Sequence, residues 1–78
     1  MMYRANQIKK VLELLAENVA TKVQPDLVDS VQIANELQLT VPETKQLLKI
    51  MHDMGVIESN MDAEYSIITR LGLNRLDA

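Results

Sequence analysis

The sequence contains no cysteine, which excludes disulfide bonds, catalysis by a thiolate and metal centres that need sulfur ligands. It also contains neither phenylalanine nor tryptophan, so the core has to be built from aliphatic side chains that pack through many small contacts. Its two glycines stand apart from each other, so the chain has no glycine-rich loop to hold a phosphate.

The sequence also lacks the features of a membrane or secreted protein. No apolar run is long enough to cross a bilayer. The opening residues "MMYRANQIKK" lack the apolar middle and the small-residue cleavage site of a secretory signal. We therefore expect a cytoplasmic protein with no membrane partner.

Residues for catalysis or metal binding are missing as well. The one histidine, His52, belongs to no histidine–carboxylate–nucleophile set, and the neighbouring Asp53 gives it no second metal ligand at helical spacing. A chain of 78 residues is also too small to enclose a substrate pocket easily. We expect no enzymatic activity, no cofactor and no metal, and we interpret His52 as an exposed helix residue.

The charge of the chain is acidic overall but unevenly distributed. The formal net charge is −3, which disfavours nonspecific binding to phosphate. Residues 1–22 hold four basic and two acidic residues, a balance of +2, whereas the remainder holds four basic and nine acidic residues, a balance of −5. Any anion-binding face should therefore draw on the first helix, where Arg4, Lys9 and Lys10 are the candidate contacts to a DNA backbone.

Apolar residues at steps of three and four predict a first helix over residues 4–20. Pro25 disfavours helix before it, so residues 21–28 are expected to form a loop, with a short strand near Leu27–Val28. Asp29 is a good N-cap for a second helix of about two turns, and Gln32 stands where a capping box needs it.

The third helix has the clearest boundaries in the chain. Thr40 is the predicted N-cap, Glu43 completes a capping box, and Pro42 occupies the first turn, where its missing N–H costs nothing. Gly55 is the predicted stop. The apolar stripe of this helix consists of Thr44, Leu47, Leu48, Met51 and Met54.

After the third helix, the β-prone runs "VIES" and "YSII" are joined by the polar segment "NMDAE", which predicts a β-hairpin. Tyr65 opens the second strand, and we expect it to pack rather than react. Thr69 is expected to cap a last short helix through Leu76, although Gly72 lowers the helix propensity of that segment.

These elements predict a single domain over residues 1–78, mainly α with a small β-hairpin, in which a short helix and a capped third helix form a helix-turn-helix. The stretches "VDSVQIANELQLT", "PETKQLLKIMHDMGVIE" and "YSIITRLG" carry a capped helix, a longer helix ending in glycine, and a strand leading to a second glycine. In this the chain resembles the winged helix-turn-helix superfamily of bacterial regulators, over residues 7–76. Gln38 departs from the superfamily, which usually has glycine at that turn because the position often needs a positive φ.

The resemblance implies that the exposed face of the third helix enters the major groove of double-stranded DNA. That face is predicted to consist of Pro42, Glu43, Lys45, Gln46, Lys49 and Ile50. Lys45 can donate to guanine or phosphate, Gln46 can pair with adenine, and Lys49 can reach a phosphate. Glu43 could accept a hydrogen bond from cytosine, but the spacing to Thr40 favours the capping role.

Other features oppose DNA binding and leave an alternative open. Only about three or four phosphate contacts are available to a monomer, so useful affinity would need a homodimer, with Leu71, Leu73 and Leu76 as a possible dimer contact. The predicted wing is acidic and would repel phosphate. The alternative is a winged-helix module that binds another protein and no DNA. Its predicted contacts in the wing are Glu58, Met61, Asp62 and Glu64.

Overall fold

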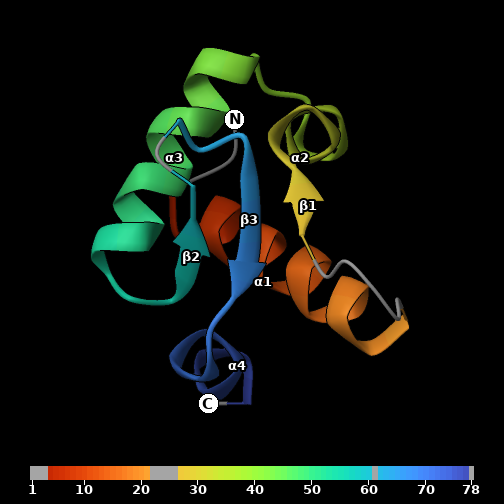
Figure 1. The fold of residues 1–78 in the computed structure, drawn as a ribbon, viewed down its shortest axis with the longest axis vertical. Coiled ribbons are helices and arrows are strands. Elements are labelled where there is room, and N and C mark those ends of the chain that lie inside the picture. The colour runs from red at the N-terminus through yellow and green to blue at the C-terminus, as the bar shows by residue number, and fades with distance from the viewer. Residues whose placement is uncertain (1–3, 22–26, 61, 78) are drawn as a thin grey trace.

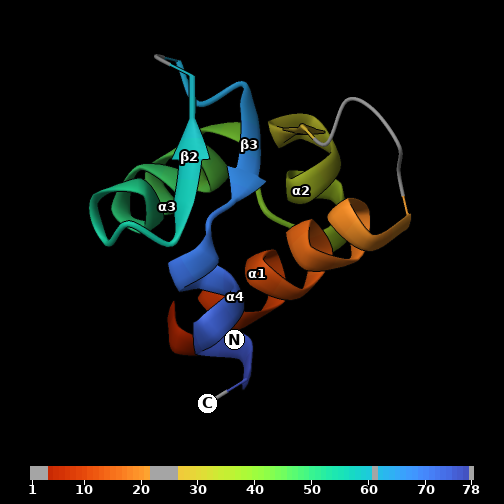
Figure 2. The ribbon, with the colours of Figure 1, turned by 60° about the horizontal axis from the view of Figure 1, so that its bottom comes forward.

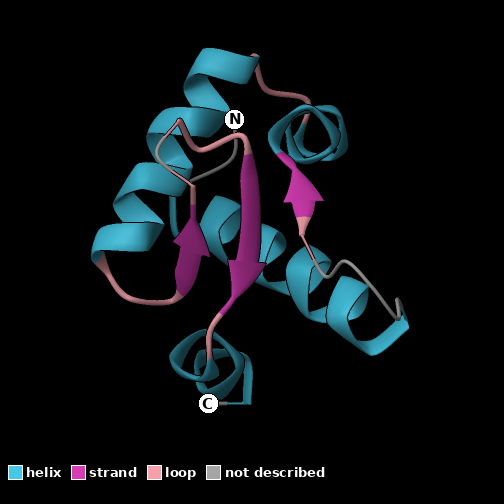
Figure 3. Ribbon diagram, viewed as in Figure 1, coloured by secondary structure: helices cyan, strands magenta, loops and turns pink. Residues whose placement is uncertain are grey.

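A computed structural model describes residues 4–21, 27–60 and 62–77 of the chain. In this part, four helices pack around a three-stranded antiparallel sheet (Figures 1 and 3), so the fold is mainly helical, as predicted. The elements in chain order are α1 (Arg4–Thr21), β1 (Val28–Asp29), α2 (Ser30–Leu37), α3 (Val41–Asp53), β2 (Ile57–Ser59), β3 (Tyr65–Ile68) and α4 (Arg70–Asp77).

The sheet has the order β1-β3-β2, with β3 in the centre. The predicted hairpin is confirmed, since Ile57 pairs with Ile68 in an antiparallel register. The strand predicted near Leu27–Val28 forms one residue later, as β1, and Val28 pairs with Ser66. β1 thus extends the hairpin to a third strand, which an antiparallel ladder allows wherever the partner strand has a free edge.

One face of the sheet covers an aliphatic core, and α1 lies behind that face in Figure 1. Because side chains alternate along a strand, Val28 and Ile68 point into the core. Ser66 points inward too, and its hydroxyl lies 2.8 Å from the hydroxyl of Ser59, a hydrogen bond that satisfies both groups. The buried cluster consists of Val11, Leu12, Leu15, Val28, Ile33, Leu37, Leu47, Leu48, Met51, Val56, Ile57 and Ile68.

The other face of the sheet corrects one expectation. Tyr65 begins β3 as predicted, but it does not pack into the core and is 44% exposed. The reason is the strand alternation, because Ser66 and Ile68 take the two inward positions of β3 and leave Tyr65 pointing outward.

Helix α2 begins and ends with local contacts. Asp29 is its N-cap, as predicted, but the Asp29 carboxylate accepts a hydrogen bond from the N–H of Val31 (2.7 Å) and not from that of Gln32. At the other end, Gln38 has φ 58° and ψ 42°, the left-handed conformation that favours glycine after the end of a helix. The N–H of Leu39 then donates to the carbonyl of Ala34 (2.9 Å), which closes the end of the helix.

The predicted capping box of α3 is confirmed in both directions. The N–H of Glu43 donates to Thr40 Oγ1 (3.2 Å), and the N–H of Thr40 donates to Glu43 Oε1 (3.1 Å). The helix ends as predicted, because Gly55 directly follows the C-cap Met54 and has φ +82°. The first turn and the last turn therefore fix both ends of the helix that carries the predicted DNA contacts.

Helix α4 is capped by Thr69, as predicted. The N–H of Gly72 donates to Thr69 Oγ1 (3.2 Å), and that hydroxyl donates to the carbonyl of Gly55 (2.7 Å). The glycine at position 72 has a packing role that helix propensity does not reveal. A Cβ atom there would lie 2.2 Å from the carbonyl oxygen of Val56. Figure 2 shows α4 lying across α1 below the sheet.

The order of the elements and of the strands is compatible with a winged helix. None of the helices in the described ranges is long and apolar enough to cross a membrane.

Candidate nucleic-acid interface

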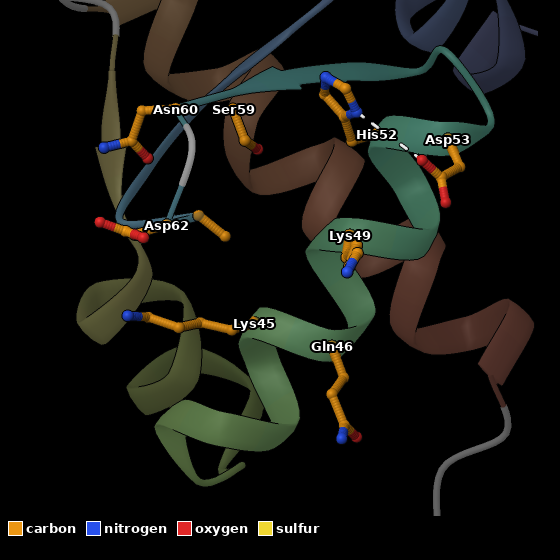
Figure 4. A pocket seen from close by; sticks show the side chains of 9 residues that line it. Lys45, Gln46, Lys49, His52, Asp53, Ser59, Asn60 and Asp62 are labelled. Carbon is orange, nitrogen blue, oxygen red and sulfur yellow. Dashed lines mark ion pairs between the residues drawn. The ribbon is translucent and has the colours of Figure 1, made fainter.

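The predicted DNA contacts of α3 lie on one side of the helix. Lys45 and Lys49 are four residues apart and therefore stack one turn above the other, with Gln46 beside them (Figure 4). Gln46 and Lys49 are exposed, together with Pro42 and Glu43, as expected. Lys45 and Ile50 are half-buried, so the exposed face of α3 is narrower than the sequence predicted.

A groove runs between α3 and the connection of the hairpin, which we call the α3–wing groove. Its volume is about 400 Å³. In Figure 4, Lys45 extends to the side of the groove where Asp62 lies, whereas Gln46 points away from the hairpin. Its lining consists of Lys45, Gln46, Lys49, His52, Asp53, Ser59, Asn60, Asp62 and Ala63.

The charges in the groove are of mixed sign. Neither Lys45 nor Lys49 makes an ion pair with any residue that the structure describes, so both amines are available to an anion. Asp62 is exposed in the same groove and carries the opposite charge. An approaching phosphate would therefore be attracted by the helix and repelled by the hairpin connection.

His52 lies one turn beyond Lys49, as the exposed helix residue that we expected. Its Nδ1 is 3.9 Å from Asp53 Oδ1 and its Nε2 is 3.8 Å from Glu58 Oε2. These distances allow ion pairing when the imidazole is protonated, but the side chains are well exposed, so the contribution to stability is small. No group of three metal-ligating side chains gathers within residues 4–21, 27–60 and 62–77.

The three basic residues predicted as backbone contacts do not lie together. Arg4 and Gln46 line a cleft of about 180 Å³ between the start of α1 and α3. Lys9 lines a different cleft, with Arg75 of α4, and Lys10 is exposed. The helical period explains the separation, because five residues turn Lys9 well away from the direction of Arg4. The structure thus brings only Arg4 next to the α3 face.

One carboxylate oxygen of Glu43 is hydrogen-bonded to the N-cap residue of its own helix. Its Oε1 accepts hydrogen bonds from the N–H of Thr40 (3.1 Å) and from Thr40 Oγ1 (2.8 Å). These bonds favour the charged form and hold the pKa of Glu43 below its ordinary value. This geometry supports the capping role over the base contact, although the base contact itself stays a prediction.

The start of α2 offers little to a phosphate. The N–H of Ser30 donates to the carbonyl of Glu64 (2.8 Å), and the N–H of Val31 donates to the Asp29 carboxylate. Two of the amides that often bind DNA phosphates at a helix start are therefore already used. Asp26, which we expected to add a second carboxylate here, lies outside the described residues.

The hairpin connection is organised by a residue that the sequence did not single out. Asn60 Oδ1 accepts hydrogen bonds from the N–H of Glu64 (2.7 Å) and from the N–H of Tyr65 (3.2 Å). Asparagine commonly caps turns in this way, so its type was the available signal. The predicted wing contacts Glu58, Asp62 and Glu64 are exposed, and Met61 lies outside the described residues.

Comparisons with protein-family models, with curated proteins and with solved structures found no match to this chain.

Proposed function

We propose that this protein is a winged helix-turn-helix protein that binds double-stranded DNA and acts as a transcriptional regulator. The observation that carries the proposal is the side of α3 on which Lys45, Gln46 and Lys49 lie together, next to a groove, with both amines free of ion pairs to described residues. The capping box supports it further, because a helix whose start is fixed presents those side chains in one orientation.

In this proposal α3 lies in the major groove. Gln46 pairs with the edge of an adenine, and Lys49 and Lys45 donate to guanine or to phosphate. Arg4 contacts the backbone on the side of α3 away from the hairpin, because it shares a cleft with Gln46. Lys9 and Lys10 contribute only through the general field of the domain, since they lie apart from this face.

The protein would bind as a homodimer. With Lys9 and Lys10 away from this face, a monomer offers Arg4, Lys45 and Lys49 to phosphate. Three contacts correspond to a slope of log K against log salt of about −3, and a two-fold dimer doubles it. The exposed leucines of α4, Leu71 and Leu73, are 50% and 40% exposed and could form the dimer contact. Leu76, the third leucine predicted for that contact, packs partly against the core of its own chain.

A titration of fluorescent random-sequence duplex DNA tests the proposal. We expect binding at about 50 mM salt that weakens steeply at about 200 mM, because counterion release dominates nonspecific affinity. Sedimentation of the same samples should give the mass of a dimer on the DNA. Absence of binding at the lower salt concentration would leave only the scaffold and reject DNA binding.

A further inference from the structure

The face of the sheet that points away from the core has an apolar centre. Tyr65 and Ile67 occupy the two outward positions of the central strand β3. Asp29 pairs with Tyr65, and continuing that register places Leu27 beside Ile67. Val31 follows β1 at the Tyr65 end of the sheet, where the N–H of Ser30 reaches the carbonyl of Glu64. We call Leu27, Val31, Tyr65 and Ile67 the outer sheet face.

Three of these side chains are exposed to a degree that is unusual for apolar residues near one another on a surface, and the fourth, Ile67, is half-buried. Leu27 is 47% exposed, Val31 is 50% exposed and Tyr65 is 44% exposed. Figure 1 shows the sheet in front of α1, and no described element lies over the side that faces the viewer. Single exposed apolar residues need no explanation, but a contiguous group around a central strand is typical of a binding surface.

The charged side chains that the strands and their ends place around the outer sheet face are acidic, and His52 of α3 approaches one of them, with its Nε2 3.8 Å from Glu58 Oε2. Asp29 and Glu58 stand beside the apolar residues as strand partners of Tyr65 and Ile67, and Glu64 precedes Tyr65 in the chain. All three carboxylates are exposed. The segments 27–33 and 56–69, which build this side of the molecule, contain four acidic residues and no lysine, arginine or histidine.

We propose that the outer sheet face binds a protein segment that presents apolar side chains flanked by lysine or arginine. The apolar centre supplies buried area, and the acidic rim selects a basic partner through complementary charge. DNA does not fit this face, because the rim would repel phosphate. A second copy fits poorly as well, because a two-fold dimer through the same face would place its own carboxylates opposite one another.

This surface differs from the α3 face. It contains none of Lys45, Gln46 and Lys49, so the proposed peptide binding does not depend on whether α3 binds DNA. It also moves the expected protein contact from the tip of the hairpin to the sheet itself. Glu58 and Glu64 keep the roles expected of them, whereas Asp62 belongs to the α3–wing groove.

The test uses the full chain, labelled with ¹⁵N, and two short synthetic peptides. One peptide alternates leucine with lysine, and the matched peptide carries glutamate in place of every lysine. We expect the lysine peptide to shift amide signals of residues 27–31 and 64–67 while those of Lys45, Gln46 and Lys49 stay unchanged. It should also bind at least about tenfold more tightly than the glutamate peptide.

Variants locate the contact. Tyr65→Thr with Ile67→Thr keeps the β propensity of the strand and should weaken binding of the lysine peptide at least about tenfold. Val19→Thr, which shortens an exposed apolar residue of α1, is the matched control and should bind normally. Glu58→Gln with Glu64→Gln changes no packing in the core, and should weaken binding and reduce its dependence on salt.

Several results would overturn the proposal. Signal shifts confined to α3 or α4, equal affinity for the two peptides, or unchanged binding by the Tyr65→Thr, Ile67→Thr variant would each reject this surface. Self-association of the wild-type chain that Ile67→Lys abolishes would assign the face to a second copy instead. If the wild type binds duplex DNA, the Tyr65→Thr, Ile67→Thr variant and the Glu58→Gln, Glu64→Gln variant should still bind it. The DNA measurement therefore separates rejection of this peptide-binding surface from rejection of the proposed function.

Discussion

A Cβ atom on Gly72 would lie 2.2 Å from the carbonyl oxygen of Val56, so the first turn of α4 crosses the end of α3 and the start of β2 at a distance that only glycine permits. The same carbonyl accepts a hydrogen bond from the N–H of Thr69 (3.1 Å) and therefore cannot easily move aside. The close approach holds α4 against the rest of the fold.

The first prediction concerns this contact. Gly72→Ala should lower the free energy of unfolding by roughly 1 to 3 kcal/mol, because the added methyl group also meets Ile68 Cγ1 at 2.7 Å. Urea denaturation measures the change. Asn74→Ala, at an exposed position of the same helix, is the control and should be neutral or slightly stabilising. Equal stability of Gly72→Ala and the wild type would show that α4 lies farther from Val56.

The second prediction concerns the turn between α2 and α3. Gln38 has φ 58°, and a side chain in this region costs on the order of 1 kcal/mol relative to glycine. Gln38→Gly should therefore raise the free energy of unfolding by at least a few tenths of a kcal/mol, after the greater entropy of glycine in the unfolded chain is subtracted. Thermal unfolding checks this. Glu36→Gly, inside α2, should instead be destabilising, and a lower melting temperature for Gln38→Gly would refute the turn geometry.

The third prediction concerns the capping box of α3. Thr40→Ala removes the hydroxyl that binds Glu43 and should destabilise the protein by about 1 kcal/mol. It should also raise the pKa of Glu43 toward its ordinary value of 4.5, because the hydrogen bond from the Thr40 hydroxyl is the largest of the causes that lower it. Since the folded-state pKa of the wild type is lowered, the stabilisation is present at neutral pH and is lost as the pH falls below 4.5 through that lowered value.

An NMR titration of the Glu43 side chain, in the wild type and in Thr40→Ala, measures this shift. Denaturation at several pH values between neutrality and acid measures the linked stability, which should depend less on pH in the variant. An unchanged Glu43 pKa in Thr40→Ala would mean that the capping box does not form in solution.

Much of the fold could be predicted because short-range chemistry sets the boundaries of its elements. Thr40, Glu43 and Gly55 identify a capped helix through side chains that lie close together in the chain. The pairing of β1 with β3 and the contact of Gly72 with Val56 could not be predicted, because they join segments far apart in sequence. The expectation that Tyr65 packs was wrong because the sequence does not show which face of a strand points inward. In the structure, Ser66 and Ile68 take the two inward positions of β3 and Tyr65 points outward.

The candidate site was predicted less completely than the fold. The spacing of Lys45 and Lys49 sufficed to place both on one side of α3. It did not reveal that Lys45 is half-buried, nor that Arg4 reaches the α3 face while Lys9 does not, because both depend on how the elements pack. Asn60 escaped notice because its bonds to the hairpin backbone require the folded turn.

The fourth prediction concerns the acidic side of the α3–wing groove. Asp62→Lys replaces repulsion of phosphate by attraction, so it should strengthen binding to duplex DNA and make the salt slope steeper by about 1 per chain. Glu13→Lys, which makes the same charge change at an exposed position of α1, is the control and should have a smaller effect. A fluorescence titration at several salt concentrations measures both. Equal effects of the two substitutions would indicate that only net charge matters and that DNA does not enter the groove.

The most direct test of DNA binding compares two variants that lose the same number of positive charges. Lys45→Gln with Lys49→Gln removes both amines of the α3 face, whereas Arg70→Gln with Arg75→Gln removes two exposed cations of α4. In fluorescence anisotropy with duplex DNA at about 50 mM salt, we predict that the lysine variant loses at least about tenfold in affinity and the arginine variant loses much less. Equal losses, or undiminished binding by the lysine variant, would contradict the assignment of α3 as the DNA-binding helix.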